Sequence, residues 1–253
     1  MTSLTPVRQL FFGDDVTFAI RRTNPIFANH VNMAINEFNR LLPEETQFRV
    51  ICWPPLLLQL QRALRKERHM RTLLVGRGGQ KIAKEVLSST TDTRHVNIQR
   101  ITSIKSSVFY AKQSVLLSST EIGDNIHVIL DDIIFSGSTI ARILSGTEVN
   151  TSKDIRIYSL IATEEGVKRI SKLGGHVWSA FYMKGRISSY ETDLLLASDL
   201  LDNEAVKLSD GSHQSYREGD WLETFFRNVR TAEKVRIRWA SLANEYHKIR
   251  VAT

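Results

Sequence analysis

The sequence predicts an α/β protein whose mainly parallel sheet is flanked by helices. Three segments lead to this prediction, because in each an apolar strand runs into a polar or glycine-rich turn that opens a helix: residues 73–87, 126–139 and 155–172. Residues 126–130 are almost continuously apolar, as expected of a parallel strand buried on both faces. Open parallel sheets bind ligands at the carboxyl ends of their strands, so the three turns form the candidate site.

The N-terminal part adds further elements before the first of these segments. Residues 29–42 and 55–70 are each expected to form a helix, and residues 48–53 a strand that ends at the Pro54-Pro55 pair. Two more strands are expected at residues 96–101 and 115–117, on either side of the polar stretch 102–112.

The first turn is rich in glycine. An apolar strand at residues 73–75 leads into Gly76, Arg77, Gly78 and Gly79, and residues 80–87 read as a helix with one apolar face. Glycines leave the backbone N–H groups accessible, and arginine adds a permanent positive charge, which together suit pyrophosphate. A dinucleotide fingerprint is excluded, because Lys81 stands at its third glycine position.

The second turn follows the strand at residues 126–130. Asp131 and Asp132 are expected at the strand's end, where adjacent carboxylates can accept hydrogen bonds from ribose hydroxyls or face a divalent metal. The next polar residues offer N–H groups and hydroxyls at a helix start, which favours a phosphate: Ser136, Gly137, Ser138 and Thr139. The alternative is a surface turn with an acidic pair. A Walker B strand is excluded, since no P-loop precedes it.

The third turn, Thr163-Glu164-Glu165-Gly166, follows an apolar strand at residues 155–162. A helix through Lys172 and a strand at residues 177–182 come next. A simple capped strand-to-helix turn explains this pattern equally well. Beyond it, residues 202–220 read as a polar loop or lid, and a long helix from Asp220 is expected to pack in the core or dock a partner through its apolar stripe: Leu222, Phe225, Val229, Ala232, Trp239, Leu242, Tyr246 and Ile249.

Composition favours a cytoplasmic protein that binds anions. The 253 residues are enough for a full core, Cys52 is the single cysteine, and no segment resembles a signal peptide or a membrane span. The net charge is +7. Two basic clusters supply much of it, as solvated helix faces or as a nucleic-acid surface: Arg62, Arg65, Lys66, Arg68 and Arg71, then Arg227, Arg230, Lys234, Arg236 and Arg238.

The three turns together resemble the type I phosphoribosyltransferases. Residues 128–139 match the family's motif for 5-phosphoribosyl 1-pyrophosphate (PRPP), residues 76–79 its pyrophosphate loop, and residues 162–166 a turn of its uracil-specific branch. The resemblance implies the family's fold, with residues 70–183 as the core. Residues 1–69 would form a helical extension packed on it, and residues 184–253 a lid or hood and a long basic helix.

The resemblance also implies roles for individual residues. Asp131, Asp132 and Arg77 would be catalytic, and the two aspartates would face Mg²⁺, directly or through water. PRPP would contact both turns: Gly76, Arg77, Gly78, Gly79, Asp131, Asp132, Phe135, Ser136, Gly137, Ser138 and Thr139. A base or nucleotide acceptor would lie against Ile134, Phe135, Thr163 and Glu164. Lys105, Tyr110 and Lys112 would belong to a mobile loop that closes over the site.

Specificity is where the sequence departs from the family. Phe135 stands where hypoxanthine-guanine enzymes carry an aspartate, and the glycine-rich base-binding segment of the uracil enzymes has no counterpart beyond Asp210-Gly211. Besides a PRPP-dependent transferase, alone or with a homo-oligomeric or other protein partner, the alternatives are a nucleotide-sensing regulator that binds nucleic acid, and an effector of a bacterial anti-phage, retron-like system. A purely structural α/β protein would leave three phosphate-suited turns unexplained.

Overall fold

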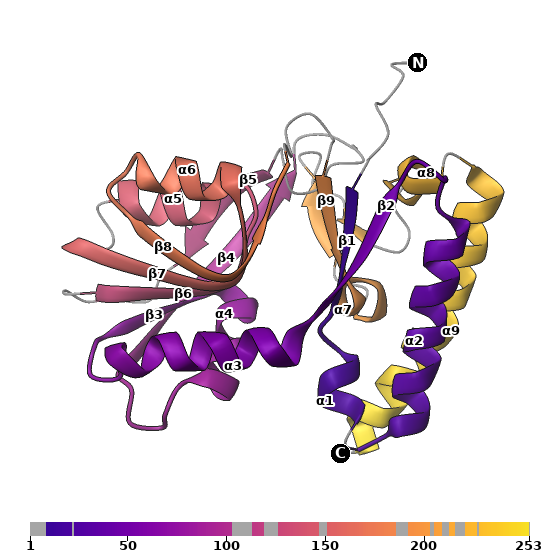
Figure 1. The fold of residues 1–253 in the computed structure, drawn as a ribbon, viewed down its shortest axis with the longest axis horizontal. Helices are drawn as coiled ribbons and strands as arrows, with labels where there is room; N and C mark the ends of the chain where they lie inside the picture. Colours follow the sequence, from indigo (N-terminus) through magenta and orange to yellow (C-terminus); the bar gives the residue numbers. More distant parts are fainter. Residues whose placement is uncertain are drawn as a thin grey trace. The chain divides into compact units, whose positions relative to one another are not determined.

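The computed structural model describes residues 9–21, 23–102, 113–118, 126–146, 151–185, 192–202, 205–208, 213–215, 221–226 and 228–252. It confirms the α/β prediction, with parallel sheets flanked by helices (Figure 1). The chain forms two compact units. The first combines Met1–Trp53, Ile101–Lys112 and Ile187–Thr253, and the second combines Pro54–Arg100 and Gln113–Arg186. No helix in the described ranges is both long and apolar enough to cross a membrane.

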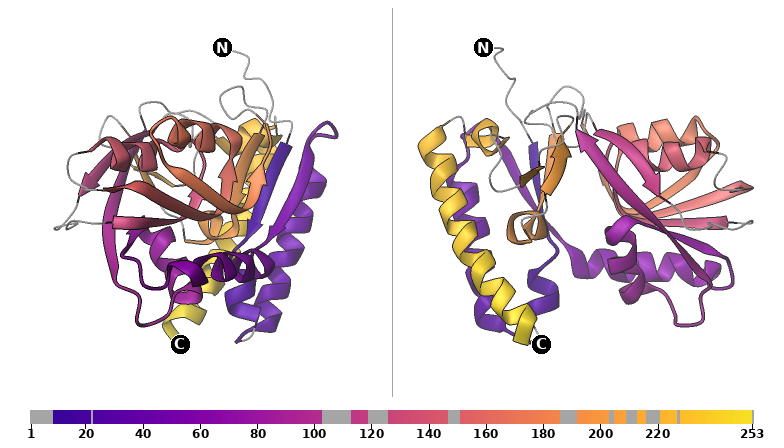
Figure 2. Two further views of the ribbon diagram at one scale, coloured as in Figure 1. Left: turned by 60° about the vertical axis from the view of Figure 1, so that its left-hand side comes forward. Right: turned by 180° about the vertical axis from the view of Figure 1, so that it is seen from behind.

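The first unit contains a three-stranded parallel sheet. Its central strand is β1 (Gln9–Asp14), flanked by β2 (Gln47–Cys52) and β9 (Thr192–Leu196). The unit's helices are α1 (Thr17–Arg21), α2 (Pro25–Leu41), α7 (Ala197–Leu201), α8 (Trp221–Phe226) and α9 (Val229–Ala252), and β10 (Ala205–Leu208) pairs antiparallel with β11 (His213–Ser215). Helix α9 lies along α2 (Figure 2). The fully buried Phe12 ring lies 5.6 Å from that of Phe38 and 5.8 Å from that of Trp239.

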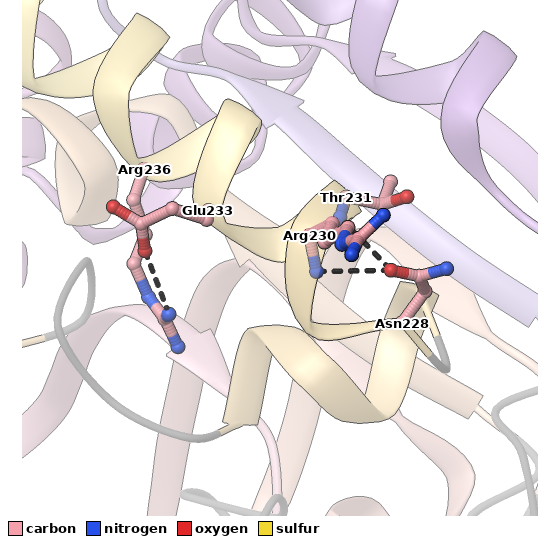
Figure 3. Close-up of polar contacts among 5 residues, drawn as sticks. All are labelled: Asn228, Arg230, Thr231, Glu233 and Arg236. Carbon is pink, nitrogen blue, oxygen red and sulfur yellow. Dashed lines mark hydrogen bonds and ion pairs between the residues drawn. The ribbon is translucent and has the colours of Figure 1, made fainter.

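The prediction of one long C-terminal helix from Asp220 is wrong in one respect, because two helices, α8 and α9, occupy this segment. Asn228 separates them, and its side-chain oxygen accepts hydrogen bonds from the N–H groups of Arg230 and Thr231 at the start of α9 (Figure 3). Asparagine is a favoured helix N-cap for this reason. Val229, assigned to the apolar stripe, is 61% exposed, whereas Val235, which was not assigned to it, is buried.

The second unit is built on parallel strands in the order β4-β3-β6-β7-β8. These are β3 (Thr72–Val75), β4 (Thr93–Thr102), β6 (Ile126–Ile134), β7 (Thr151–Thr163) and β8 (His176–Met183), and β5 (Gln113–Ser118) pairs with β4. Helices α3 (Trp53–Leu64) and α4 (Gly76–Val86) lie on one side of this sheet, and α5 (Ser138–Ser145) and α6 (Glu164–Ser171) on the other (Figure 1). A short 3₁₀ helix, η1 (Arg65–Glu67), follows α3.

Most of the predicted strands and helices are present, with shifted ends. The helix predicted to begin at Gln80 begins at Gly76, and the helix predicted to reach Met70 ends at Leu64. The predicted core, residues 70–183, lies in the second unit apart from residues 101–112, while the segments before Pro54 and after Arg186 join in the first unit. The three-part domain division stays a prediction.

Candidate functional site

The three predicted turns meet at the carboxyl edge of the second unit's sheet. Strands β3, β6 and β7 are parallel neighbours, so the segments that follow them emerge on the same side. Each is followed by a helix, α4, α5 and α6 respectively. The strand order therefore places the glycine-rich turn, the Ser136–Thr139 turn and the Thr163 turn together at one edge.

The two carboxylates lie within β6 rather than after it, which corrects the expectation of a strand ending at Leu130. The strand continues to Ile134 because β7 pairs with it through this stretch, with Asp131 opposite Ser159. Asp131 is 3% exposed, and one of its carboxylate oxygens accepts a 2.9 Å hydrogen bond from the Asp132 N–H. Neighbouring side chains in a strand point to opposite faces, so the two carboxylates cannot share one orientation.

Asp132 faces the glycine-rich turn. A Cβ built on Gly78 would lie 2.1 to 2.2 Å from the carboxyl atoms of Asp132, so this position can hold no side chain without displacing the carboxylate. Asp132 is partly exposed, whereas its neighbour Asp131 is buried. Of the two, Asp132 is therefore the carboxylate that a ligand bound on the turn would meet.

The glycine-rich turn forms the first turn of α4. The first N–H groups of a helix have no partner within it, and the helix dipole adds a partial positive charge there. Gly76 has a φ of 58°, and a Cβ on Gly79 would lie 2.6 Å from the Leu130 carbonyl oxygen, so the helix start packs directly on β6. Arg77 is exposed beside these N–H groups. The arrangement suits pyrophosphate.

The start of α5 is a second turn whose geometry suits an anion. Gly137 is its N-cap with a φ of 68°, a conformation that glycine adopts readily, and the hydroxyl oxygens of Ser136 and Ser138 lie 2.7 Å apart. Ser138 and Thr139 are partly exposed in the first turn of α5, where N–H groups again lack partners in the helix. A phosphate is the ligand that this geometry fits.

The third turn supports the second. The Thr163 hydroxyl donates to the Phe135 carbonyl and accepts a 3.0 Å hydrogen bond from the Gly166 N–H, which caps α6. A Cβ on Gly137 would lie 2.7 Å from the Gly166 carbonyl oxygen. Thr163 is 1% exposed. This turn therefore acts as a rigid support beneath residues 135–137.

Phosphoribosyltransferases are among the solved structures that the chain resembles, as its motifs predicted. Similarity to a purine phosphoribosyltransferase from Pyrococcus horikoshii Ot3 covers 56% of this chain and 85% of that one, at 14% identity and a TM-score of 0.36. Similarity to the APRTase from Giardia lamblia complexed with 9-deazaadenine covers 51% of this chain and 77% of that one, at 13% identity and a TM-score of 0.39. Similarity to the orotate phosphoribosyltransferase from Aeropyrum pernix covers 51% of this chain and 70% of that one, at 15% identity and a TM-score of 0.32.

No protein-family model and no curated protein sequence matches the chain. At 13 to 15% identity and TM-scores below 0.4, the three similar structures are too distant to assign an activity. The case for a function therefore depends on the residues of this chain.

The residues predicted to contact an acceptor are mostly inside the protein. Ile134 and Phe135 are 1% and 5% exposed, so their side chains offer little surface to a base. Thr163 is occupied by its two hydrogen bonds, whereas Glu164 is exposed. Lys105, Tyr110 and Lys112, predicted for the mobile loop, lie outside the described residues.

Sequence reasoning missed the supporting role of the third turn. Its signals are a threonine directly before a helix and a glycine three residues later, which predict a cap. They do not predict which carbonyl the same hydroxyl would reach, because Phe135 is 28 residues away in sequence.

The described residues contain no cluster of three or more His, Cys, Asp or Glu side chains that could hold a metal by themselves. Mg²⁺ binds through one or two carboxylates together with substrate phosphates and retained waters, and the partly exposed Asp132 beside the glycine-rich turn has the chemistry for such a ligand.

Proposed function

We propose that the protein transfers a 5-phosphoribosyl group from PRPP to a nucleobase or a related acceptor and releases pyrophosphate. One observation supports this more than any other: Gly78 of the glycine-rich turn lies against the carboxylate of Asp132, close enough that no Cβ fits between them. A sugar held at Asp132 would thus have its pyrophosphate on one helix start and its 5′-phosphate on the next.

Each part of PRPP has a partner in this arrangement. The N–H groups and hydroxyls of residues 136–139 would hold the 5′-phosphate, and Asp132 would accept hydrogen bonds from the ribose. The pyrophosphate would rest on the N–H groups of residues 76–79 and the Arg77 guanidinium. Hydrogen bonds to charged groups contribute about 1.5–3 kcal/mol each, so four or five suffice for tight binding of the phosphate.

Catalysis would be mainly electrostatic. Positive charge develops on the sugar as the bond from C1′ to pyrophosphate breaks, and Asp132 stabilises that charge. Arg77 and the start of α4 stabilise the negative charge on the leaving group. Mg²⁺, bound by Asp132 together with the pyrophosphate, would supply further neutralisation. Asp131 acts indirectly, since its carboxylate is buried and fixes the backbone of Asp132 through a hydrogen bond.

The acceptor would lie beside the proposed phosphate-binding turn. Glu164 is the exposed candidate, at the start of α6 beside the phosphate-binding turn. Phe135, which replaces the family's purine-facing aspartate, is buried, so a proton exchange with a purine at this position is not expected. Nucleotide sensing with nucleic-acid binding, and a role in anti-phage defence, stay alternative predictions.

The direct test combines two readouts. Purified protein is incubated with Mg²⁺, PRPP and single purines, pyrimidines or nucleotides, while released pyrophosphate and product masses are measured together. Pyrophosphate release that depends on one acceptor, with a matching nucleotide mass, is the expected result.

A matched pair of variants makes the test specific. Asp132→Asn should abolish turnover with little change in thermal stability, because the side chain is partly exposed. Asp154→Asn removes an exposed aspartate near the amino end of β7 and should leave turnover unchanged. If wild-type protein binds neither PRPP nor ribose 5-phosphate, the proposed function is wrong.

A further inference from the structure

The residues between α3 and β3 carry an unusual charge pattern. Residues 62–71, which we call the basic segment, contain five arginines and lysines and one acidic residue, Glu67. The segment comprises the end of α3, the 3₁₀ helix η1 and the turn into β3. On sequence alone, Glu67 would offset part of its positive charge.

The structure removes Glu67 from the surface. Its side chain is 4% exposed, and Oε1 accepts hydrogen bonds from the Arg156 guanidinium and from the Tyr158 hydroxyl, the latter at 2.9 Å. Burial raises the pKa of Tyr158 to about 12, and the hydrogen bond to Glu67 contributes to this shift. The Tyr158 hydroxyl therefore stays protonated and can donate to Glu67. The negative charge of Glu67 is thus paired with Arg156 of β7, which lies outside the basic segment.

The cations of the basic segment remain outside. Arg62, Arg65 and Lys66 are exposed, and none of them forms an ion pair with a residue in the described ranges. Arg68 is exposed and donates a hydrogen bond to His69. Arg71 alone is neutralised, by Asp92 at 2.7 Å. Exposed Arg94, two residues beyond Asp92, adds a further positive charge nearby.

The C-terminal basic cluster differs in this respect. Arg236 contacts Glu233 at 3.2 Å, as Figure 3 shows, and Arg238 lies 3.8 Å from Glu37 of α2. Two of its five cations therefore have carboxylate partners. The basic segment is the cluster whose own acidic residue is withdrawn into the protein.

The basic segment does not serve the PRPP site. It enters β3 at Thr72, and the glycine-rich turn begins at Gly76, after the other end of that strand. At about 3.3 Å per residue, Arg71 and Gly76 are about 16 Å apart along the strand. The two anion-binding surfaces thus lie at opposite edges of the same sheet.

Helix stability alone does not explain the charges. Cations near a helix C-terminus contribute about 0.3–1 kcal/mol through the helix dipole, and this effect is confined to the last turn. It accounts for Arg62, in the last turn of α3, but not for Arg68 beyond η1. Three or four neighbouring unpaired cations instead repel one another unless a polyanion binds.

We propose that the basic segment is a docking surface for the phosphate backbone of a nucleic acid. Arginine supplies most of its charge, and its planar fork matches phosphate oxygens in pairs. Binding through such contacts is largely independent of sequence and falls steeply with salt. The surface is separate from the transferase site, and the proposal stands whether or not the protein transfers phosphoribosyl groups.

The test uses a charge-matched control in the same unit. Arg62→Gln/Arg65→Gln/Lys66→Gln removes three positive charges from the basic segment, and Lys168→Gln/Arg169→Gln/Lys172→Gln removes three exposed ones from the C-terminal end of α6. Both sets lie at the C-terminal end of a helix, so loss of helix-dipole interactions is similar in the two variants. Binding of labelled 20-nucleotide single-stranded DNA and RNA is followed by fluorescence anisotropy at several salt concentrations.

The expected result is a selective loss. The basic-segment variant should bind at least tenfold more weakly. The slope of log Kd against log salt should fall by about two, because each of the three lost phosphate contacts contributes about 0.7 to it. The α6 variant should bind like wild type. Absence of binding by wild type, equal weakening in both variants, or equally strong competition by polyglutamate would each overturn the proposal. Asp132→Asn should bind nucleic acid normally.

Discussion

Replacing Thr163 by valine tests whether the third turn supports the proposed phosphate-binding turn, residues 136–139. Valine has nearly the shape of threonine but lacks the hydroxyl, so the Phe135 carbonyl and the Gly166 N–H each lose a partner in a buried place. A buried polar group left without a hydrogen bond costs about 1–3 kcal/mol, and loss of a helix N-cap costs about 0.5–2 kcal/mol. We expect Thr163→Val to lower the free energy of unfolding by about 2–4 kcal/mol.

The same change should weaken phosphate binding. If disorder at residues 135–137 reduces the binding free energy by about 1.4 kcal/mol, the affinity for ribose 5-phosphate falls about tenfold. Pyrophosphate is proposed to bind on α4, whereas the two hydrogen bonds of the Thr163 hydroxyl go to Phe135 and Gly166, so the affinity for pyrophosphate should stay the same. Urea unfolding and titration calorimetry with the two ligands measure these effects separately.

Thr163→Ser is the control, because serine keeps the hydroxyl and loses one methyl group, worth about 0.8 kcal/mol. It should bind ribose 5-phosphate like wild type. A serine variant as impaired as the valine variant would refute the reasoning, since the hydroxyl would then not be the important group. A valine variant that changes only the affinity for a base would instead support the predicted acceptor contact.

Three further outcomes are expected. Gly79→Ala should lower stability by more than 1 kcal/mol in urea unfolding, because its Cβ would meet the Leu130 carbonyl oxygen at 2.6 Å and backbone cannot move aside cheaply. Gly137→Ala should weaken ribose 5-phosphate binding in calorimetry, since a φ of 68° and the Gly166 carbonyl oxygen at 2.7 Å both oppose a side chain; unchanged affinity would contradict the assigned phosphate turn. Burial raises the pKa of Asp193 from 3.8 to about 7, so the folded protein holds this proton more tightly than the unfolded chain. The contribution of Asp193 to stability is therefore fully present below about pH 4 and falls by up to about 4 kcal/mol as pH rises to 7, and Asp193→Asn should remove that part of the pH dependence in urea unfolding measured across this range.

The features that the sequence predicted well are local ones. Residues 126–130 and 155–162 are apolar runs that lead into turns with recognisable chemistry, and both lie in strands of the second unit. The extension of β6 through Asp131 and Asp132 was not predictable, because the acidic pair has low strand propensity and is kept in the strand by pairing with β7.

The features that the sequence did not predict depend on residues that are distant in the sequence. Strand β9 is five residues long, and its one strand partner among the described residues is β1, which is about 180 residues earlier in the sequence, so periodicity gives it little signal. The difference between Asp131 and Asp132 is equally hidden in the sequence, since it arises from the alternation of side chains between a covered face and the glycine-rich turn. Likewise, Glu67 reads as a surface charge until Arg156 and Tyr158 are placed around it.

The composition of the first unit affects how the protein must be made. Its central strand β1 pairs on one side with β2, which follows it closely, and on the other with β9, which is synthesised only after the whole second unit. Helix α9, which packs on α2, comes later still. During synthesis, one edge of β1 therefore remains unpaired until β9 emerges, and Phe12 and Phe38 lack their packing partner Trp239. The last strand of the second unit precedes β9, so this unit can fold first, and nascent chains are expected to acquire the three turns of the candidate site before the first unit is complete.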